Sequence, residues 1–397
     1  MSEQYEDGPE FVDGEVLEDL TGQDSEYGAE PDGDEDDEDM NETPPEDDSI
    51  HCFEGHEDAV VSVAWANNEL VASGGCDNNA YIWRVGQDAY EATSGSMGTF
   101  ELKGHTDTVV SLAFNFNGNL LATGGMDGLC KIWDATNGKL LQTLEGSGGA
   151  IEWVTWHPKG NVVLAGTEDM LSYMWMAATG QEMQIFSGHS GVVSAGTFTP
   201  DGKTVVTVGG EDDCSLRAWN PKTGVCTTHI KGNNFHREAI TCVAISKDSE
   251  AAITGGVDGG VCISNVSTGR ILGQLSGHEN SVESVGFCAD LPLAASADVD
   301  GKLLVWDCGS LQLRGTCEHP TSITRMVLHP KQPLAFTACL DGVLRIWDLR
   351  TAKCLKEMTG HVDAIQDLAL SPDGQFVLTG GDDNACRVFS VNSSKSD

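Results

Sequence analysis

The sequence predicts an all-β protein, an eight-bladed β-propeller, preceded by an acidic segment that does not fold. From residue 49 onward the chain repeats itself every 41 to 50 residues, the spacing at which four-stranded propeller blades recur. Short strands such as Val109 to Phe114 alternate with turn sequences such as Asn117-Gly118. Residues 1–48 contain 22 Asp or Glu and no Lys or Arg, and such a composition cannot bury enough apolar surface to form a core.

A Gly-His pair, or an altered copy of it, opens each repeat. The eight positions are Gly55-His56, Gly104-His105, Ser147, Gly188-His189, Phe235-His236, Gly277-His278, Glu318-His319 and Gly360-His361. A Trp or a substitute follows 27 to 30 residues later, and an Asp stands six residues before it in every repeat. These pairs are Asp77 and Trp83, Asp127 and Trp133, Asp169 and Trp175, Asp213 and Trp219, Asp258 and Ser264, Asp300 and Trp306, Asp341 and Trp347, and Asp383 and Phe389.

The repeat resembles that of the WD40 family, whose naming dipeptide stands at Trp133-Asp134, Trp306-Asp307 and Trp347-Asp348. The resemblance covers about residues 49–391. It implies that the His, a hydroxyl residue, the turn Asp and the Trp of a blade form one buried hydrogen-bonded set. Matching sets are His56, Ser73, Asp77 and Trp83; His105, Thr123, Asp127 and Trp133; His278, Ser296, Asp300 and Trp306; and His319, Thr337, Asp341 and Trp347.

Two blades lack members of this set. Blade three has Ser147 in place of the His and Ala165 in place of the hydroxyl residue, and blade five has Ser264 in place of the Trp. A buried polar group without its partner costs about 1–3 kcal/mol. We therefore expect blades three and five to be the least rigid.

The end of the sequence predicts how the ring closes. The last repeat ends near Val391, after a third strand, whereas residues 49–53 precede the first Gly-His pair. Pairing these two segments completes the last blade and removes an exposed strand edge. The predicted domains are therefore a disordered acidic tail at residues 1–48, a propeller at residues 49–391 closed by residues 49–53, and a disordered C-terminus at residues 392–397.

Composition limits the function classes. The net charge is −40, which opposes direct binding to nucleic acid and favours a basic protein partner. The 13 Cys are odd in number and nowhere spaced as CxxC, so neither a disulfide framework nor a thiolate metal site is expected. With no bilayer-spanning apolar run and no signal peptide, we expect an intracellular monomer without membrane insertion, in the cytoplasm, with a nuclear share left open.

The sequence contains no pattern that predicts catalysis. The His and Asp residues recur once per blade with a structural role, and the Gly146 to Gly149 run lacks the Lys-Ser/Thr of a phosphate-binding loop. We therefore expect a protein-binding scaffold with no catalytic residue, cofactor or metal.

Propellers commonly bind partners on their narrow face. By this rule the exposed positions lie three and five residues after the repeat His and directly before the turn Asp. Apolar residues there are Val61, Val110, Met126, Val299 and Leu340. The predicted partner-binding residues are Glu152, with the adjacent Trp153, and Glu168, Glu211, Asp212, Glu283 and Asp382. Blades three and four concentrate acids without a basic residue at these positions, which would attract a basic segment.

Three stretches resemble a narrower family, that of angio-associated migratory cell protein and its fungal relatives. They are residues 151–166, residues 257–273 with Ser264-Asn265 in place of Trp-Asp, and residues 280–288. The resemblance implies a soluble scaffold whose fungal members act as dedicated chaperones for a basic ribosomal protein of the large subunit. A polyanionic surface would shield such a client from binding RNA at random.

Two alternatives remain at this stage. Trp347-Asp348-Leu349-Arg350 resembles the WDxR box that docks receptors onto cullin-type ubiquitin ligases, so Trp347, Asp348 and Arg350 are candidate docking residues. Animal relatives are linked to cell migration and signalling, which would make the protein a scaffold at the cell cortex.

Overall fold

A computed structural model describes residues 46–66, 69–85, 98–232, 234–288 and 290–392. These residues form one compact unit. Most of the acidic tail and residues 393–397 lie outside the described residues. Only residues 46–48 of the predicted tail are described, and they contact the propeller.

The described residues form eight antiparallel four-stranded sheets, which confirms the predicted eight-bladed propeller. The strands of blades one to four are β2 Val60–Trp65, β3 Leu70–Gly75, β4 Ala80–Arg84, β5 Phe100–Leu102; β6 Val109–Phe114, β7 Leu120–Gly125, β8 Cys130–Asp134, β9 Lys139–Leu144; β10 Ile151–Trp156, β11 Val162–Thr167, β12 Leu171–Met176, β13 Gln181–Ser187; and β14 Ala195–Phe198, β15 Val205–Val208, β16 Leu216–Trp219, β17 Cys226–Ile230. Those of blades five to eight are β18 Ile240–Ile245, β19 Ala251–Gly256, β20 Val261–Asn265, β21 Ile271–Leu275; β22 Val282–Phe287, β23 Leu293–Asp298, β24 Lys302–Asp307, β25 Gln312–Glu318; β26 Ile323–Leu328, β27 Leu334–Cys339, β28 Leu344–Asp348, β29 Lys353–Met358; and β30 Ile365–Leu370, β31 Phe376–Gly381, β32 Cys386–Ser390, with β1 His51–Phe53.

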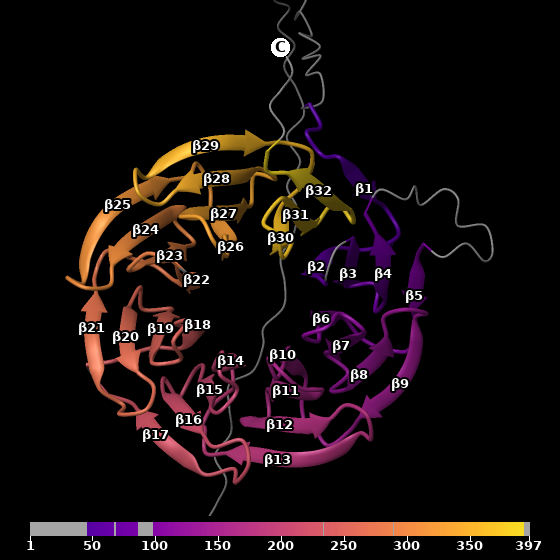
Figure 1. Ribbon diagram of the computed structural model, residues 1–397, viewed down its shortest axis with the longest axis horizontal. Coiled ribbons are helices and arrows are strands. Elements are labelled where there is room, and N and C mark those ends of the chain that lie inside the picture. Colours follow the sequence, from indigo (N-terminus) through magenta and orange to yellow (C-terminus); the bar gives the residue numbers. More distant parts are fainter. Residues whose placement is uncertain (1–45, 67–68, 86–97, 233, 289, 393–397) are drawn as a thin grey trace, which may run out of the picture. The chain divides into compact units, whose positions relative to one another are not determined.

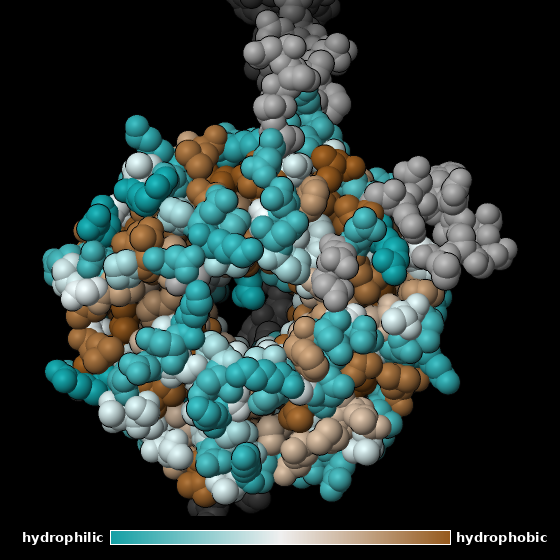
Figure 2. All heavy atoms as spheres, viewed as in Figure 1, coloured by the Kyte–Doolittle hydropathy of each residue, from teal (hydrophilic) through white to brown (hydrophobic). Residues whose placement is uncertain are grey.

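The blades stand radially around a central opening (Figure 1). The first strand of each blade lies nearest the axis and the fourth lies at the rim. Figure 2 shows one face of this ring, with mostly hydrophilic side chains around the opening. Among the described residues, no helix has the length and apolar character needed to cross a membrane.

The N-terminal strand β1 closes the ring. It pairs antiparallel with β32, with His51 opposite Val388 and Phe53 opposite Cys386. The Phe53 ring also stacks on Trp83 of blade one, with centroids 4.9 Å apart and planes at 11°. Because one short strand thus joins the last blade by its backbone and the first blade by its side chain, the sheet edge of blade eight is covered.

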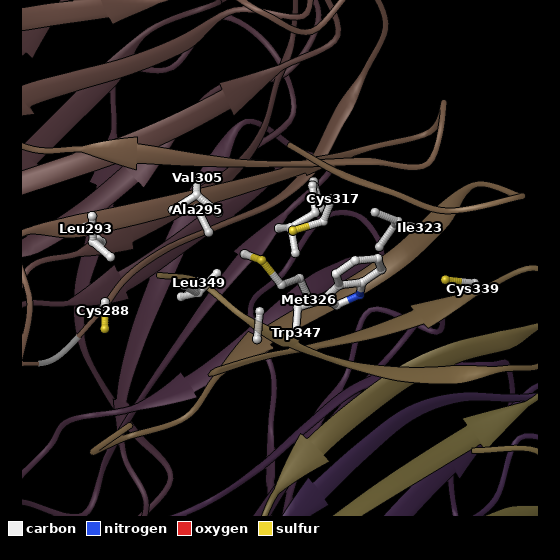
Figure 3. Close-up of a cluster of buried hydrophobic side chains, with 13 residues drawn as sticks. Cys288, Leu293, Ala295, Val305, Cys317, Ile323, Met326, Cys339, Trp347 and Leu349 are labelled. Carbon is white, nitrogen blue, oxygen red and sulfur yellow. The ribbon is translucent and has the colours of Figure 1, made fainter. Parts of the chain in front are cut away.

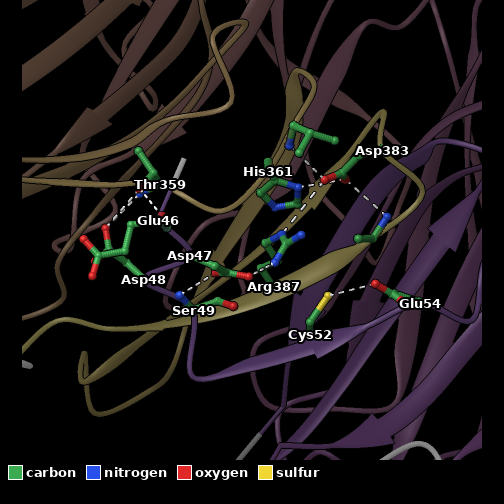
Figure 4. Close-up of polar contacts among 12 residues, drawn as sticks. Glu46, Asp47, Asp48, Ser49, Cys52, Glu54, Thr359, His361, Asp383 and Arg387 are labelled. Atoms are coloured by element: carbon green, nitrogen blue, oxygen red, sulfur yellow. Dashed lines mark hydrogen bonds and ion pairs between the residues drawn. The ribbon is translucent and has the colours of Figure 1, made fainter. Parts of the chain in front are cut away.

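The residues just before β1 fasten this closure (Figure 4). The Asp47 carboxylate accepts a hydrogen bond from the Arg387 guanidinium in β32. The backbone N–H of Asp48 donates to the Thr359 carbonyl at 2.8 Å, and the N–H of Thr359 donates to the Asp48 carboxylate at 3.1 Å. Residues 46–48 of the predicted tail therefore take part in closing the propeller.

The hydrophobic core lies between neighbouring blades. Between blades six and seven, Trp347, Met326 and Leu349 pack against residues of blade six (Figure 3). Small side chains on the second strand of blade six, Ala295 and Ala297, are fully buried there and leave room for the large residues of the next blade. Each blade thus stabilises its neighbours, because its buried apolar surface needs the adjacent sheet as a cover.

The buried hydrogen-bonded set is complete in blade two. His105 joins Asp127 through Nδ1 at 3.0 Å and Thr123 through Nε2 at 2.8 Å, and the Trp133 indole donates to Thr123 at 2.9 Å. Blade four repeats the arrangement with His189, Thr207, Asp213 and Trp219. These contacts join the loop that carries the repeat His to the second and third strands of its blade.

Two predicted sets are wrong in their aspartate. In blade six, His278 bonds Asp298 at 2.6 Å, whereas the predicted Asp300 accepts hydrogen bonds from Asn280. In blade seven, His319 Nδ1 donates to the Gly301 carbonyl at 2.9 Å, and Asp341 pairs instead with Arg345 at 2.7 Å. In blade six, Asp298 replaces the repeat aspartate as the partner of the histidine. In blade seven, the histidine bonds a carbonyl and the repeat aspartate pairs with Arg345. Both repeat aspartates keep their place in the sequence.

Other sets are incomplete among the described residues. The indole N–H groups of Trp83 and Trp175 and the hydroxyl of Ser264 are buried without a hydrogen-bond partner. The predicted set of blade one is therefore wrong in its last member, since His56 bonds Asp77 and Ser73 but Trp83 relies on stacking. Greater mobility of blades three and five stays a prediction.

We predict that Thr123→Val destabilises the propeller by about 1–3 kcal/mol, because His105 and Trp133 then lose a shared buried partner. Urea unfolding monitored by fluorescence measures this change. Thr106→Val, at an exposed position of the same blade, is the control and should leave the midpoint unchanged. Equal midpoints for the two variants would contradict the role assigned to the buried hydroxyl.

We also predict that stability falls as the pH drops from about 7.5 to about 4.5. Burial lowers the pKa of His319 to about 4, and its Nε2 must stay unprotonated to accept the Trp347 indole N–H at 2.9 Å. Since the unfolded chain binds a proton below about pH 6.5, the stabilisation is full above that pH and is lost on acidification. Urea midpoints of His319→Asn should depend less steeply on pH; an unchanged slope would refute this origin.

Candidate functional site

The narrow face, formed by the loops that carry the repeat His and the turns that carry the aspartates, surrounds a channel. The channel has a volume of about 460 Å³ and is lined by residues of the first strands, among them Glu152, Trp153, Arg325 and Asp367. First strands reach the axis because each blade is radial (Figure 1). The side chain five residues after the repeat His therefore faces the channel in most blades.

Two of the predicted acids, Glu152 and Glu168, lie on blade three. Both are exposed, and neither side chain makes an ion pair or hydrogen bond with the described part of the chain. Partial burial and the neighbouring Glu168 charge raise the pKa of Glu152. Burial is the larger cause and the repulsion from Glu168 adds to it, so that a cation arriving beside the two carboxylates would be stabilised.

Trp153 lines the channel beside Glu152, but much of its role is structural. Its indole N–H donates to the Val193 carbonyl of blade four at 2.8 Å. A Cβ atom on Gly166 or Gly196 would lie 2.3 Å and 2.4 Å from the indole ring, respectively. Glycine at both positions therefore leaves room for the ring, and Trp153 lines the channel together with Glu152.

Glu211 and Asp212 lie on the adjacent turn of blade four, and both are exposed. Asp212 has a positive φ of 68°, which fits the tight turn. The Val193 N–H donates to the Thr167 carbonyl, and the Gly210 N–H donates to the Val192 carbonyl. The 190–193 segment thus joins the turn that carries Glu168 to the turn that carries Glu211.

The structure adds basic residues that the sequence reasoning missed. Lys231 and Arg237 line one cavity of about 590 Å³ together with Glu211 and Asp212. They lie outside the three positions per blade that the sequence rule considers, on either side of the altered Phe235-His236 pair. The uncompensated negative charge therefore centres on blade three and is partly offset on blade four.

The other two predicted acids are bound by their own blades. The Ser281 hydroxyl donates to Glu283 at 2.6 Å, and the Gln366 amide donates to Asp382 at 2.8 Å. Neither residue is on the channel lining. The structure thus brings four of the six acids to blades three and four, and leaves Glu283 and Asp382 on blades six and eight.

A further charged pair lies in the channel and was not predicted. The Arg325 guanidinium stands 3.3 Å from Asp367, and the backbone N–H of Val63 donates to Asp367 at 2.9 Å. Burial raises the pKa of Asp367 against the opposing effect of Arg325. Asp367 joins blade eight to blade one, and Arg325 leaves a half-exposed cation on the side of the channel formed by blade seven.

Large apolar side chains are exposed directly before the turn aspartates. Met126, Val257 and Leu340 are 52%, 42% and 48% exposed. The narrow face therefore exposes an apolar side chain before the turn aspartate in blades two, five and seven. Elsewhere in the described residues, no group of three His, Cys, Asp or Glu side chains is arranged to hold a metal ion.

The candidate ligase-docking residues lie at the end of β28 and in the turn that follows, at the opposite face. Trp347 and Asp348 are buried, at 6% and 7% exposure, and only Arg350 is exposed. Its guanidinium donates to Asp348 at 3.0 and 3.1 Å, an arrangement that a structural role explains equally well. Docking through Arg350 stays a prediction.

The comparisons with known proteins support the fold and identify the family. The model of the WD domain, G-beta repeat, matches the chain eight times, at residues 47–84, 97–134, 138–175, 180–220, 224–264, 269–307, 311–348 and 352–390. The chain belongs to the WD40-repeat family. WD40 propellers are generally scaffolds for protein partners.

Among WD40-repeat relatives, human angio-associated migratory cell protein is 32% identical over 362 residues, which cover 87% of this chain and 80% of the relative. This confirms the narrower family resemblance. Sqt1 of Chaetomium thermophilum is 25% identical, with a TM-score of 0.79 over 88% of this chain and 99% of Sqt1. Sqt1 has also been solved bound to the N-terminus of ribosomal protein L10, and that structure has a TM-score of 0.78, 24% identity, and coverage of 87% and 100%.

We predict that Glu168→Gln lowers the pKa of Glu152 toward the ordinary glutamate range, while partial burial keeps it raised. NMR titration of the Glu152 side chain measures the shift. Glu182→Gln, on the outer strand β13, removes the same charge away from the channel and should leave the Glu152 pKa unchanged. An equal effect of the two variants would show that the Glu152–Glu168 pair is not a local charge cluster.

Proposed function

We propose that the protein binds a basic segment of a ribosomal protein on the narrow face at blade three and shields it until assembly into the large subunit. The carrying observation is the pair of exposed carboxylates, Glu152 and Glu168, that make no ion pair among the described residues. Trp153 beside them supplies an apolar surface. In this proposal the protein acts as a monomeric, non-enzymatic chaperone in the cytoplasm.

Electrostatics support the choice of a basic partner. The chain carries a net charge of −40, so that a cationic segment is attracted at long range and a nucleic acid is repelled. The carboxylates of Glu152 and Glu168, which make no ion pair among the described residues, localise this attraction at blade three. Bringing a Lys or Arg side chain there relieves the repulsion between Glu152 and Glu168.

The similarity to known proteins supports the choice of client. Sqt1, which shares the fold, has been solved with the N-terminus of ribosomal protein L10. An unassembled ribosomal protein carries positive charge that would otherwise bind RNA without specificity. The client that we propose for this chain is therefore the N-terminal segment of ribosomal protein L10.

The test uses the full chain and a synthetic peptide of the N-terminal segment of ribosomal protein L10 from the same organism. Isothermal titration should show binding that weakens as the salt concentration rises. The double variant Glu152→Gln/Glu168→Gln should weaken binding about tenfold or more, equivalent to about 1.4 kcal/mol, because both charges that face the peptide are removed.

The matched control is Glu69→Gln/Glu250→Gln. Both residues are exposed and lie between the first and second strands of their blades, on the opposite face. The control changes the net charge by the same amount and should leave the affinity unchanged. Similar losses in both double variants would reduce the effect to net charge, and salt-independent binding would contradict an electrostatic site.

A further inference from the structure

A single position recurs on the third strand of each blade, two residues before the Trp position. Polar residues stand there in six blades: Tyr81, Lys131, Tyr173, Arg217, Arg345 and Arg387. Five of them bond an oxygen: Tyr81 reaches Glu101 at 3.2 Å, Tyr173 reaches Asp169 at 2.8 Å, and Lys131 reaches Thr143 at 3.4 Å. Arg345 pairs with Asp341 and Glu357, and Arg387 pairs with Asp47.

Arg217 of blade four is the exception. Within the described ranges its guanidinium makes no hydrogen bond and no ion pair, and its Nε is buried without a partner. It lies over Trp219, with the guanidinium carbon 5.9 Å from the ring centroid, at the outer limit of a cation–π contact. The residue opposite it on β17 is His229, where Arg345 has Glu357.

In blade eight, the arginine at this position binds a carboxylate. There the sequence Thr359-Gly360-His361 precedes the first strand, and Arg387 stands on the third. The Asp47 carboxylate lies above Gly360, within 2.7 Å of where a Cβ would be, and accepts from Arg387 (Figure 4). The Thr359 hydroxyl donates to the Glu46 backbone carbonyl, and the Thr359 N–H donates to the Asp48 carboxylate. The Arg387 Nε is also buried without a hydrogen bond, so the acid is held through the outer nitrogen.

Blade four carries equivalent residue types at the same positions of the repeat. Ser187-Gly188-His189 corresponds to Thr359-Gly360-His361, and Arg217 corresponds to Arg387. Among the eight blades, all described at these positions, only blades four and eight combine a hydroxyl residue, a Gly-His pair and an Arg. In blade four the guanidinium itself covers Gly188, its Nη1 lying 3.0 Å from where a Cβ would be, and Ser187 is exposed.

The nearby charges leave this arginine available. The Asp213 carboxylate is occupied by His189, Ser215 and Ser190. Lys231, two residues beyond His229, stands 3.9 Å from Asp213 and shares its cavity with Glu211 and Asp212. Those acids offset Lys231, but neither they nor any other described carboxylate bonds Arg217.

We propose that the corner formed by Ser187, Gly188 and Arg217 binds an extended acidic segment of a partner protein, with an aspartate on Arg217 as Asp47 lies on Arg387. The Ser187 hydroxyl would bond the backbone of that segment, as Thr359 does in blade eight. A guanidinium binds a carboxylate strongly because both the charge and the hydrogen-bonding geometry match. This site is independent of the carboxylates of blade three and takes the opposite charge.

The test uses the full chain and a fluorescent peptide of residues 44–51, whose sequence, Pro-Pro-Glu-Asp-Asp-Ser-Ile-His, contains the segment that blade eight binds. Fluorescence anisotropy at low ionic strength should show saturable binding. Arg217→Gln should weaken binding about tenfold or more, and the peptide with Asp47→Asn should bind as weakly to the unaltered chain.

A second variant covers the case in which Arg217→Gln disturbs folding. His229→Glu places a carboxylate opposite Arg217, as Glu357 faces Arg345, and should block the peptide while the thermal midpoint is kept. Arg314→Gln, an exposed arginine of blade six, should bind normally.

Three results would overturn the proposal. One is the absence of saturable binding, and another is equal binding by Arg217→Gln and the unaltered chain. The third is binding that is lost in Arg387→Gln but kept in Arg217→Gln, which would place the peptide on blade eight by exchange with the chain's own residues 46–48.

Discussion

Strand β1 joins the two ends of the ring, and every blade depends on that junction. Its backbone pairs with β32, and its Phe53 side chain stacks on Trp83 in blade one. Because the apolar core lies between blades, an open ring would expose core surface on both terminal blades as well as a strand edge. The Asp47–Arg387 pair and the Thr359 contacts extend the same junction (Figure 4). Closure holds the blades in place, and the placed blades define the channel.

The repeat in the sequence was sufficient to predict the number of blades, their order and the segment that closes them. It was not sufficient to predict which polar groups meet. Asp300 and Asp341 stand at the right spacing from their tryptophans, yet Asp298 and the Gly301 carbonyl replace them as partners of the repeat histidines. Spacing fixes the backbone position of a residue, whereas its partner is decided by competition among all acceptors within reach.

The candidate site was predictable in part for the same reason. Glu152 and Glu168 occupy regular repeat positions on blade three, and the charge of Glu168 contributes to the raised pKa of Glu152. Lys231 and Arg237 belong to the altered loop of blade five, where the repeat spacing gives no guidance, and they change the charge beside Glu211 and Asp212. Arg217 could not be singled out from the sequence, because its lack of an acidic partner appears only when blades four and eight are compared in space. Within the described residues, the propeller thus combines exposed carboxylates on blade three with an arginine on the third strand of blade four that makes no ion pair.

The location of the basic client on the narrow face is the claim that most needs a direct measurement. Zero-length carbodiimide cross-linking joins a carboxylate to a lysine only when the two are in contact, and mass spectrometry identifies the pair. With the basic ribosomal peptide bound, cross-links should fall on Glu152 and Glu168 and decrease as salt is added. Cross-links confined to acids of the opposite face or the outer strands, such as Glu250 or Glu182, would contradict binding at the channel mouth.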